Sequence, residues 1–393
     1  MKKILKDILY NLISSFLIVF VIQFLIYPFL GKYLTIEEYG FFLVSIGVIN
    51  MISVGFSSAI GNLRLINQKK YVKASEYNNF LAVVFLFVTV IYFISRLIFN
   101  DINILYLLLV LFMIFKNYHA YSFRIDINYN NTLILNLITA SGYMLGLLIY
   151  KLFFQEWIFI FIFGEFLGLI FIIFKAKTVK EEFKIVKENR EMYSQFISLS
   201  FASLLGNSMV YIDRLLLFPL LGSPSVSIFV VASFVGKSIG LFVTPINSVF
   251  LTYLSKSNDL NLKIFRKICS FLIVIFLLIF SVTYFLGDYF TKILYPEIYE
   301  DAQKYIVISS ASALTFIFGT ILNTFLLKMS DIRWQLRTQI LYTTIYILFG
   351  TIILVYYDLE IFIYFTIFLN LLRVYFIYYI IKTSSQNRQE EAK

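Results

Sequence analysis

Long apolar runs return along almost the whole chain, and short polar stretches separate them. A helix needs roughly 20 apolar residues to cross a bilayer, and only helices and closed barrels satisfy their own backbone hydrogen bonds there. The runs predict an all-α integral membrane protein with about twelve transmembrane helices. The expected spans are 9–30, 39–61, 78–98, 102–123, 132–152, 156–174, 195–218, 225–253, 268–287, 304–326, 339–357 and 360–381.

Composition excludes a water-soluble fold, because only 14% of the residues are charged and soluble domains carry about 25%. The single cysteine, Cys269, rules out an internal disulfide or a cysteine metal cluster, and the single histidine leaves little room for metal-based chemistry. The sequence has no phosphate-binding glycine loop and no zinc-ligand spacing. We therefore expect no enzyme activity, metal or organic cofactor, and proton or sodium coupling as the source of energy.

We attribute the net charge of +10 to the membrane topology of the chain. With both termini in the cytoplasm, 24 of the 33 Lys and Arg residues fall on the inner side, five on the outer side and four inside the membrane. Positive charge accumulates in cytoplasmic loops of membrane proteins. The basic balance therefore predicts this orientation, with the lipid bilayer and not nucleic acid as the partner.

The two halves of the chain resemble repeats of each other. Tyr27-Pro28-Phe29-Leu30-Gly31 ends the first expected span, and Phe218-Pro219-Leu220-Leu221-Gly222 ends the seventh. Repeats of this kind are common in transporters, which bind substrate near the bilayer midplane where the repeats meet. The predicted organisation is an N-terminal six-helix lobe (1–174), a cytoplasmic linker (175–193), a C-terminal six-helix lobe (194–382) and a cytoplasmic tail (383–393).

Two neighbouring spans between Ser194 and Lys256 carry charges at membrane depth, at Asp213, Arg214 and Lys237. Such a charge costs on the order of 3 kcal/mol in the bilayer, so it usually faces protein or a water-filled cavity. Other polar residues follow at steps of three or four and form one stripe on each helix. The stripes are Ser200, Ser203, Asn207, Tyr211 and Arg214, and Ser233, Lys237, Gly240, Thr244 and Asn247. They predict a central polar cavity shared by two six-helix lobes.

The ionisable residues at membrane depth carry more positive than negative charge. They are Lys116, His119, Glu165, Asp213, Arg214, Lys237 and Arg373. An excess of cations suits an anionic substrate group such as a phosphate, which Arg can bind with two hydrogen bonds. We expect Arg214, Lys237, Lys116, Arg373, Asn207 and His119 to bind substrate. Asp213 and Glu165 are candidates for binding a coupling ion, and the alternative for each charge is a structural pair inside the bundle.

An acidic pair follows Thr35 on the outer side, at Glu37 and Glu38. A catalytic pair would need further chemical groups nearby, and none is visible. The spacing of Thr35 and Glu38 instead predicts a capping box that opens the second span.

Three short motifs resemble the polysaccharide-transporter branch of the multidrug/oligosaccharidyl-lipid/polysaccharide flippases, the Wzx-type O-antigen flippases. They are Leu34-Thr35-Ile36-Glu37-Glu38-Tyr39-Gly40, Tyr211-Ile212-Asp213-Arg214 and Val243-Thr244-Pro245-Ile246. The layout of twelve spans extends the resemblance over nearly the whole chain. It implies a flippase that moves an undecaprenyl-diphosphate-linked oligosaccharide across the bacterial cytoplasmic membrane by alternating access. A polysaccharide polymerase is then a candidate partner.

Two alternatives stay open. A membrane-embedded polymerase or glycosyltransferase would need a substantial outer loop, and the largest candidate, from Asp288 to Lys304, is small. A multidrug antiporter of the same superfamily would favour cationic drugs and hence an acidic cavity, whereas the charges at membrane depth are mostly positive.

Overall fold

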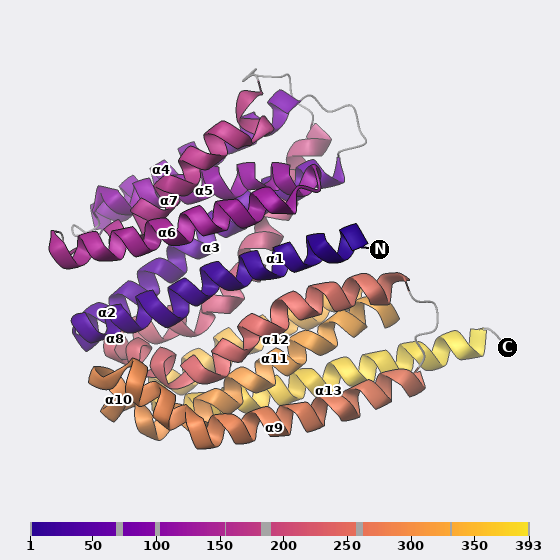
Figure 1. The fold of residues 1–393 in the computed structure, drawn as a ribbon. Coiled ribbons are helices and arrows are strands. Elements are labelled where there is room, and N and C mark those ends of the chain that lie inside the picture. Colours follow the sequence, from indigo (N-terminus) through magenta and orange to yellow (C-terminus); the bar gives the residue numbers. More distant parts are fainter. Residues whose placement is uncertain are drawn as a thin grey trace. The chain divides into compact units, whose positions relative to one another are not determined.

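Every regular element in the described part of the chain is a helix (Figure 1). The computed structural model describes residues 2–67, 74–98, 103–153, 155–181, 190–256, 262–330 and 332–391. Within these ranges, 11 helices are long and apolar enough to cross a membrane. One of them, Glu191–Gly240, covers 50 residues and contains a kink, so it accounts for two predicted spans. The prediction of an all-α membrane protein with about twelve spans is confirmed.

The elements follow the predicted spans closely. In chain order they are α1 (Lys2–Phe20), the π-helix η1 (Val21–Ile26), α2 (Tyr27–Tyr33), α3 (Ile36–Ile66), α4 (Ala74–Ile98), α5 (Ile104–Ile125), α6 (Tyr129–Leu152), α7 (Ile158–Lys175), the 3₁₀ turn η2 (Lys177–Lys180), α8 (Arg190–Lys256), α9 (Leu262–Leu294), α10 (Pro296–Ala302), the 3₁₀ turn η3 (Gln303–Tyr305), α11 (Ile306–Met329), α12 (Ile332–Tyr356) and α13 (Leu359–Glu391). The short helix α10 and the 3₁₀ turn η2 lie outside the predicted spans.

The first span changes its winding just before Pro28. In a regular α-helix, the Pro28 ring would clash with the carbonyl group of Phe24, four residues earlier, and Pro28 has no N–H to donate to that carbonyl. The residues before Pro28 form the wider π-helical turn η1, which contains Phe24. Helix α2 then continues the span with Pro28 and Leu30 buried.

Helix α8 is kinked at Gly222, which has φ 79° and ψ 175°. This combination belongs to a backbone region that is essentially restricted to glycine. Pro224 follows two residues later and restricts the chain further. The kink divides α8 at the turn that separates the predicted seventh and eighth spans.

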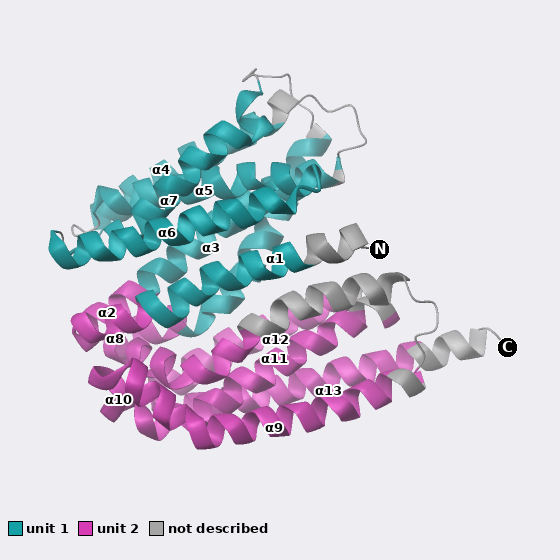
Figure 2. Ribbon diagram, viewed as in Figure 1, with its two compact units in different colours: residues 1–26, 44–213 teal, residues 27–43, 214–393 magenta. Residues whose placement is uncertain are grey.

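The chain forms two compact units, shown in different colours in Figure 2. Unit 1 contains residues 1–26 and 44–213, and unit 2 contains residues 27–43 and 214–393. The units are interleaved in sequence, because unit 2 includes residues 27–43 from the N-terminal half of the chain. Unit 1 in turn continues to residue 213, beyond the predicted start of the C-terminal lobe at 194. The predicted lobe boundaries rest on the sequence repeat and stay a prediction.

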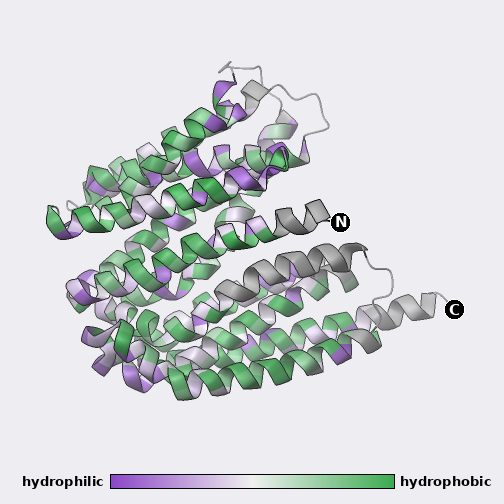
Figure 3. Ribbon diagram, viewed as in Figure 1, coloured by the Kyte–Doolittle hydropathy of each residue, from purple (hydrophilic) through white to green (hydrophobic). Residues whose placement is uncertain are grey.

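Each unit has its own core. In unit 1, α6 packs along α7, and Phe123, Leu135 and Ile172 form part of the interior. In unit 2, α11 packs along α13, and Phe265 of α9 and Phe325 of α11 are fully buried in the core that α9, α11 and α13 share. Apolar residues cover long stretches of the helices in Figure 3.

The outer surface of α9 shows what surrounds these cores. Phe271, Leu278 and Phe285 are 64%, 63% and 75% exposed. A soluble protein rarely exposes an apolar surface of this extent, whereas lipid chains cover it without cost. The exposure therefore agrees with a multi-pass membrane protein.

The predicted capping box opens α3. The Thr35 N–H donates to Glu38 Oε2 at 2.9 Å, and the Glu38 N–H donates to Thr35 Oγ1 at 3.2 Å. The two residues satisfy backbone donors that the start of a helix leaves without partners. The interpretation of this acidic pair as a helix cap is confirmed.

The same end of α3 packs tightly on α8 within unit 2. A Cβ atom on Gly40 would lie 1.9 Å from the Ser223 carbonyl oxygen, so only glycine fits there. The Ser227 hydroxyl donates to the Ile36 carbonyl at 2.6 Å and ties the two helices together. Tyr39 is fully buried beside Tyr295. Packing within unit 2 thus accounts for Tyr39 and Gly40 of the motif Leu34–Gly40.

We expect Gly222→Ala to destabilise the protein by about 1–3 kcal/mol, because alanine would hold a backbone conformation that it strongly disfavours. Thermal unfolding of the purified protein in detergent measures the change. Gly206→Ala is the matched control: Gly206 lies in α8, and apart from the backbone of its own helix no described atom lies within 4 Å of where its Cβ would be. Alanine also favours the helix. Equal stability of the two variants would contradict the proposed strain at Gly222.

Candidate functional site

A buried ion pair joins three helices of unit 1. The Lys116 ammonium on α5 donates to Glu165 Oε1 on α7 at 2.9 Å and lies 2.8 Å from Oε2. The Tyr143 hydroxyl on α6 donates to the same carboxylate. Lys116 and Glu165 are only 5% and 1% exposed. The carboxylate therefore balances the lysine charge directly, and the substrate role of Lys116 and the coupling role of Glu165 stay predictions.

His119 lies one turn beyond Lys116 on α5 and is buried. Its Nδ1 atom is 2.8 Å from the Thr178 hydroxyl in η2, and its ring contacts the rings of Phe115 and Tyr118. Lys116 and His119 both face α7 and the turn that follows it, as their spacing of three residues predicts. The predicted substrate contact of His119 stays a prediction.

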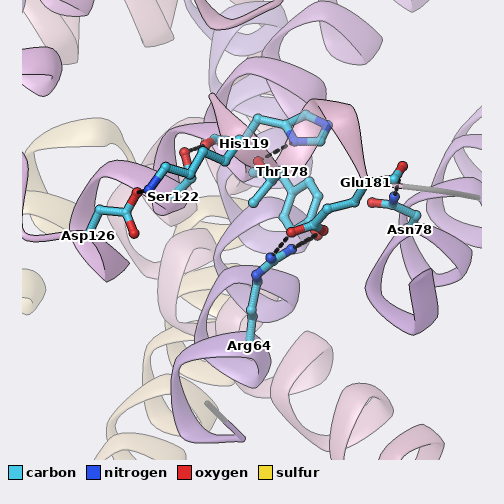
Figure 4. Close-up of polar contacts among 9 residues, drawn as sticks. Arg64, Asn78, His119, Ser122, Asp126, Thr178 and Glu181 are labelled. Atoms are coloured by element: carbon cyan, nitrogen blue, oxygen red, sulfur yellow. Dashed lines mark hydrogen bonds and ion pairs between the residues drawn. The ribbon is translucent and has the colours of Figure 1, made fainter. Parts of the chain in front are cut away.

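A second polar cluster in unit 1 was not predicted (Figure 4). Arg64, near the end of α3, forms an ion pair with Glu181 through its Nη1 and Nη2 atoms, in the two-bond geometry that makes such pairs strong. Asn78 Nδ2 on α4 donates to the Glu181 carbonyl at 3.4 Å, and Arg64 donates to the Tyr118 hydroxyl at 3.3 Å.

These contacts fix the start of the predicted linker to unit 1. Ala176 and Thr178 are buried there, so this part of the segment is folded onto the helices. Nothing in the spacing of Arg64 and Glu181, which are far apart in sequence, pointed to their pairing.

The predicted polar stripe on the first half of α8 is only partly buried. Asn207 Nδ2 donates to the Ser203 carbonyl at 2.7 Å, within its own helix. Tyr211 lies against Gly47 of α3. Asp213 is 7% exposed and ends the part of α8 that belongs to unit 1. The roles of Asn207 and Asp213 stay predictions.

Arg214 begins the part of α8 that belongs to unit 2 and is 6% exposed. Its Nη1 donates to the Leu43 carbonyl on α3 at 3.1 Å, and its guanidinium neighbours the Tyr27 hydroxyl on α2. The side chain thus connects the separate segment 27–43 to the rest of unit 2. Its predicted contact with substrate stays a prediction.

Lys237 lies on α8 beyond the kink at Gly222 and is half-buried. Its ammonium lies 4.9 Å from the centre of the Phe229 ring, within the range of a cation–π contact. Ser233, on the same predicted stripe, is buried and bonds to its own helix. Thr244 and Asn247, the last members of that stripe, lie outside the described side chains.

Arg373 lies near the middle of α13 and is 8% exposed. Its guanidinium is 4.9 Å from the centre of the Tyr342 ring on α12 and 5.4 Å from that of Phe316 on α11. Asn370, one turn earlier, accepts a hydrogen bond from the Tyr342 hydroxyl at 2.9 Å. Asn370 also donates to the Ser312 carbonyl at 3.1 Å.

This polar network in the core of unit 2 was not predicted. Thr366, Asn370 and Arg373 follow at steps of four and three along α13, which is the same stripe pattern that pointed to α8. Applying that pattern to the last span would have found the network.

The cations of unit 2 lie on helices that are poor in carboxylates. The residues of α8 from 214 to 256 contain no Asp or Glu, and neither do α11 and α12. On α13, Glu360 is in the first turn and the other acids are at the far end. Residues 214–256 of α8 and the middle of α13 therefore carry basic residues and no acidic ones, although Asp213 directly precedes Arg214 on α8. In unit 1, Glu165 pairs with Lys116.

Comparison with solved structures shows which fold these helices share. The chain is similar to an inward-facing multidrug resistance MATE family transporter of the MOP superfamily, with a TM-score of 0.63 and 14% identity over 97% of this chain and 96% of the other. An outward-facing MATE transporter matches with a TM-score of 0.59, 14% identity, and coverage of 98% and 96%. The Vibrio cholerae MATE transporter VcmN in its bent form matches with a TM-score of 0.60, 12% identity, and coverage of 97% of each chain.

At this identity the similarity establishes the fold alone, over essentially the full length of the chain. No family model matches the sequence, and no curated protein matches it. The fold is MATE-like, and these neighbours are transporters rather than enzymes.

We expect Glu165→Gln to destabilise the protein by about 3–5 kcal/mol, because it leaves the Lys116 charge buried without its counter-charge. Thermal unfolding in detergent measures the loss. The double variant Lys116→Met/Glu165→Gln removes the charge as well, so it should recover most of the stability. If Glu165→Gln unfolds at the wild-type temperature, the carboxylate does not stabilise Lys116.

Proposed function

We propose that this protein is a secondary transporter that moves its substrate across the membrane by alternating access. The observation that carries the proposal is the MATE-like fold, which extends over 97% of the chain in the comparison with the inward-facing transporter. Solved neighbours with inward-facing and outward-facing conformations share this fold, which supports alternating access for the family of structures. The stretch from Asp288 to Lys304, the largest candidate for the outer loop of a polymerase, forms the end of α9, α10 and part of η3.

For the substrate we propose an amphiphile with an anionic group, and specifically an undecaprenyl-diphosphate-linked oligosaccharide. The support is electrostatic: Arg214, Lys237 and Arg373 lie on α8 and α13, whose parts in unit 2 have acidic residues only near the two ends of α13. Asp213, directly before Arg214, belongs to unit 1. Cations in such a region attract a diphosphate, and Arg and Lys bind it through charge-assisted hydrogen bonds. The protein would then act in the bacterial cytoplasmic membrane with both termini inside, and a polysaccharide polymerase would use its product.

Multidrug export is the second candidate, and the structural neighbours favour it at least as well. The inward-facing and outward-facing structures are of a multidrug resistance transporter. A drug exporter that carries cations needs acidic groups to receive them, and the described helices of unit 2 offer few. The two candidates therefore differ in the charge of the substrate, which an experiment can separate.

We further propose that a proton or sodium gradient supplies the energy, with Asp213 and Glu165 as the candidate carboxylates. Both are buried in unit 1. Glu165 is already engaged by Lys116 and Tyr143, so a coupling ion at that site would compete with the lysine charge.

Lys237 offers the sharpest test of the anionic substrate. Arg214 donates a hydrogen bond to segment 27–43, so replacing it could impair folding as well as binding. Lys237 is half-buried and lies beside the Phe229 ring in the same helix. In bacteria that lack their own repeat-unit flippase, we expect the wild type to restore surface polysaccharide. Lys237→Ala should lower the yield roughly tenfold or more, since a hydrogen bond to a charged group is worth about 1.5–3 kcal/mol.

The control variant Lys237→Arg keeps the charge and should retain most of the yield at matched expression. In a parallel strain without multidrug exporters, we expect the wild type to leave resistance to cationic dyes unchanged. A rise in dye resistance without restored polysaccharide would overturn the anionic substrate and favour multidrug export.

A further inference from the structure

Residues 176–181, which follow α7, are held to unit 1 along most of their length, and we call them the strap. Ala176 is fully buried, and Val179 packs against the apolar core that α5, α6 and α7 share. Thr178 is buried as well, and its hydroxyl lies 2.8 Å from Nδ1 of His119 on α5. The strap is therefore folded onto the helices of unit 1.

Arg64 on α3 holds the end of the strap (Figure 4). Its Nη1 donates to Glu181 Oε2 at 2.8 Å, and its Nη2 donates to the other carboxylate oxygen. Nη1 also donates to the Tyr118 hydroxyl on α5 at 3.3 Å, and the guanidinium carbon lies 5.2 Å from the centre of the Tyr77 ring on α4. One side chain thus joins three helices to the strap.

The chain returns to the same helices at the start of α8. Asn67 directly follows α3, and its Nδ2 donates to Gln195 Oε1 on α8 at 3.2 Å. The Phe80 ring on α4 packs against Tyr193 and Phe196 of α8, with ring centres 4.9 and 4.5 Å apart. Residues 182–189 lie outside the described part of the chain. The segments on both sides of them are attached to α3 and α4.

Every partner in these contacts belongs to unit 1, which continues to residue 213. The chain passes between the units after residues 26, 43 and 213, and all three positions lie within helical segments. A movement of one unit relative to the other can therefore leave the strap in place. Releasing the strap, in contrast, would strand the charge of Arg64, whose side chain is only 15% exposed, without its carboxylate, and this is costly.

We propose that residues 176–181 are a permanent strap of unit 1, which Arg64 locks across the ends of α3, α4 and α5. The strap stays docked while the protein changes conformation. The segment that joins the two halves of the sequence then moves with unit 1 and is not the hinge between the units. This last consequence rests on the alternating-access function proposed above, whereas the docking itself does not.

Labelling of a buried thiol measures how often the strap is released. Thr178→Cys places the thiol at a buried position of the strap, and Lys180→Cys places it at an exposed position as the matched control. In the full-length protein in nanodiscs, we expect a water-soluble maleimide to label the Thr178→Cys variant on the order of a hundredfold more slowly than the Lys180→Cys variant. Peptide mass spectrometry separates this labelling from that of the natural Cys269, which is buried. Similar rates in the two variants would overturn the proposal.

Charge variants made in the Thr178→Cys protein connect the docking to Arg64. Arg64→Ala should speed the labelling roughly tenfold or more, because it removes two hydrogen bonds to a carboxylate. Exchanging the charges, in Arg64→Glu/Glu181→Arg, should slow the labelling again. Lys177→Ala removes a pair with Asp126 whose side chains are 80% and 40% exposed, so it should change the rate less than about twofold. An unchanged rate in Arg64→Ala, or in Glu181→Gln if the first variant does not fold, would overturn the role of Arg64.

Energised membranes test whether the strap stays docked during transport. In inverted vesicles, which present the strap to the reagent in the predicted topology, we expect the Thr178→Cys variant to be labelled at the same rate with and without a proton or sodium gradient. Faster labelling under a gradient would show release during the cycle and would overturn the permanent strap. Restoration of surface polysaccharide by the wild type tests the proposed function separately, so the failure of one proposal can be told from the failure of the other.

Discussion

The cost of a charge inside the bilayer is the constraint on which the arrangement of polar residues depends. Unit 1 meets it with a direct counter-charge, since Glu165 lies 2.8 Å from the Lys116 ammonium and Tyr143 holds the carboxylate. In unit 2, Arg214 turns to the Leu43 carbonyl and Arg373 to aromatic faces. The two units therefore accommodate buried cations differently: unit 1 uses a carboxylate, whereas unit 2 uses a backbone carbonyl and aromatic rings.

Much of the fold could be predicted from the sequence, because hydropathy and the length of a membrane span are strong constraints. The spans, the turn at Gly222 and the capping box at Thr35 and Glu38 all appear as expected. Helix α10 could not be predicted from apolar runs, since a seven-residue helix is too short to carry a pattern. The interleaving of the units was also hidden, because it depends on contacts between segments that are distant in sequence.

Less of the candidate site could be predicted. The sequence identified which charges lie at membrane depth, but it could not assign their partners. Lys116 and Glu165 were placed in different roles as a substrate ligand and a coupling carboxylate, and the structure brings them together. The pair of Arg64 and Glu181 and the network around Asn370 involve residues on separate helices, so spacing along one helix could not reveal them.

The pair of Lys116 and Glu165 also limits how this protein can evolve. The two residues are 49 positions apart, yet a change in either one alone leaves a charge stranded in the membrane. For stability alone, two neutral residues avoid the stranded charge as well as an ion pair does, so the route between these states passes through a less stable intermediate or through a simultaneous change. Related chains should accordingly carry both charges or neither, so the two positions are expected to change together.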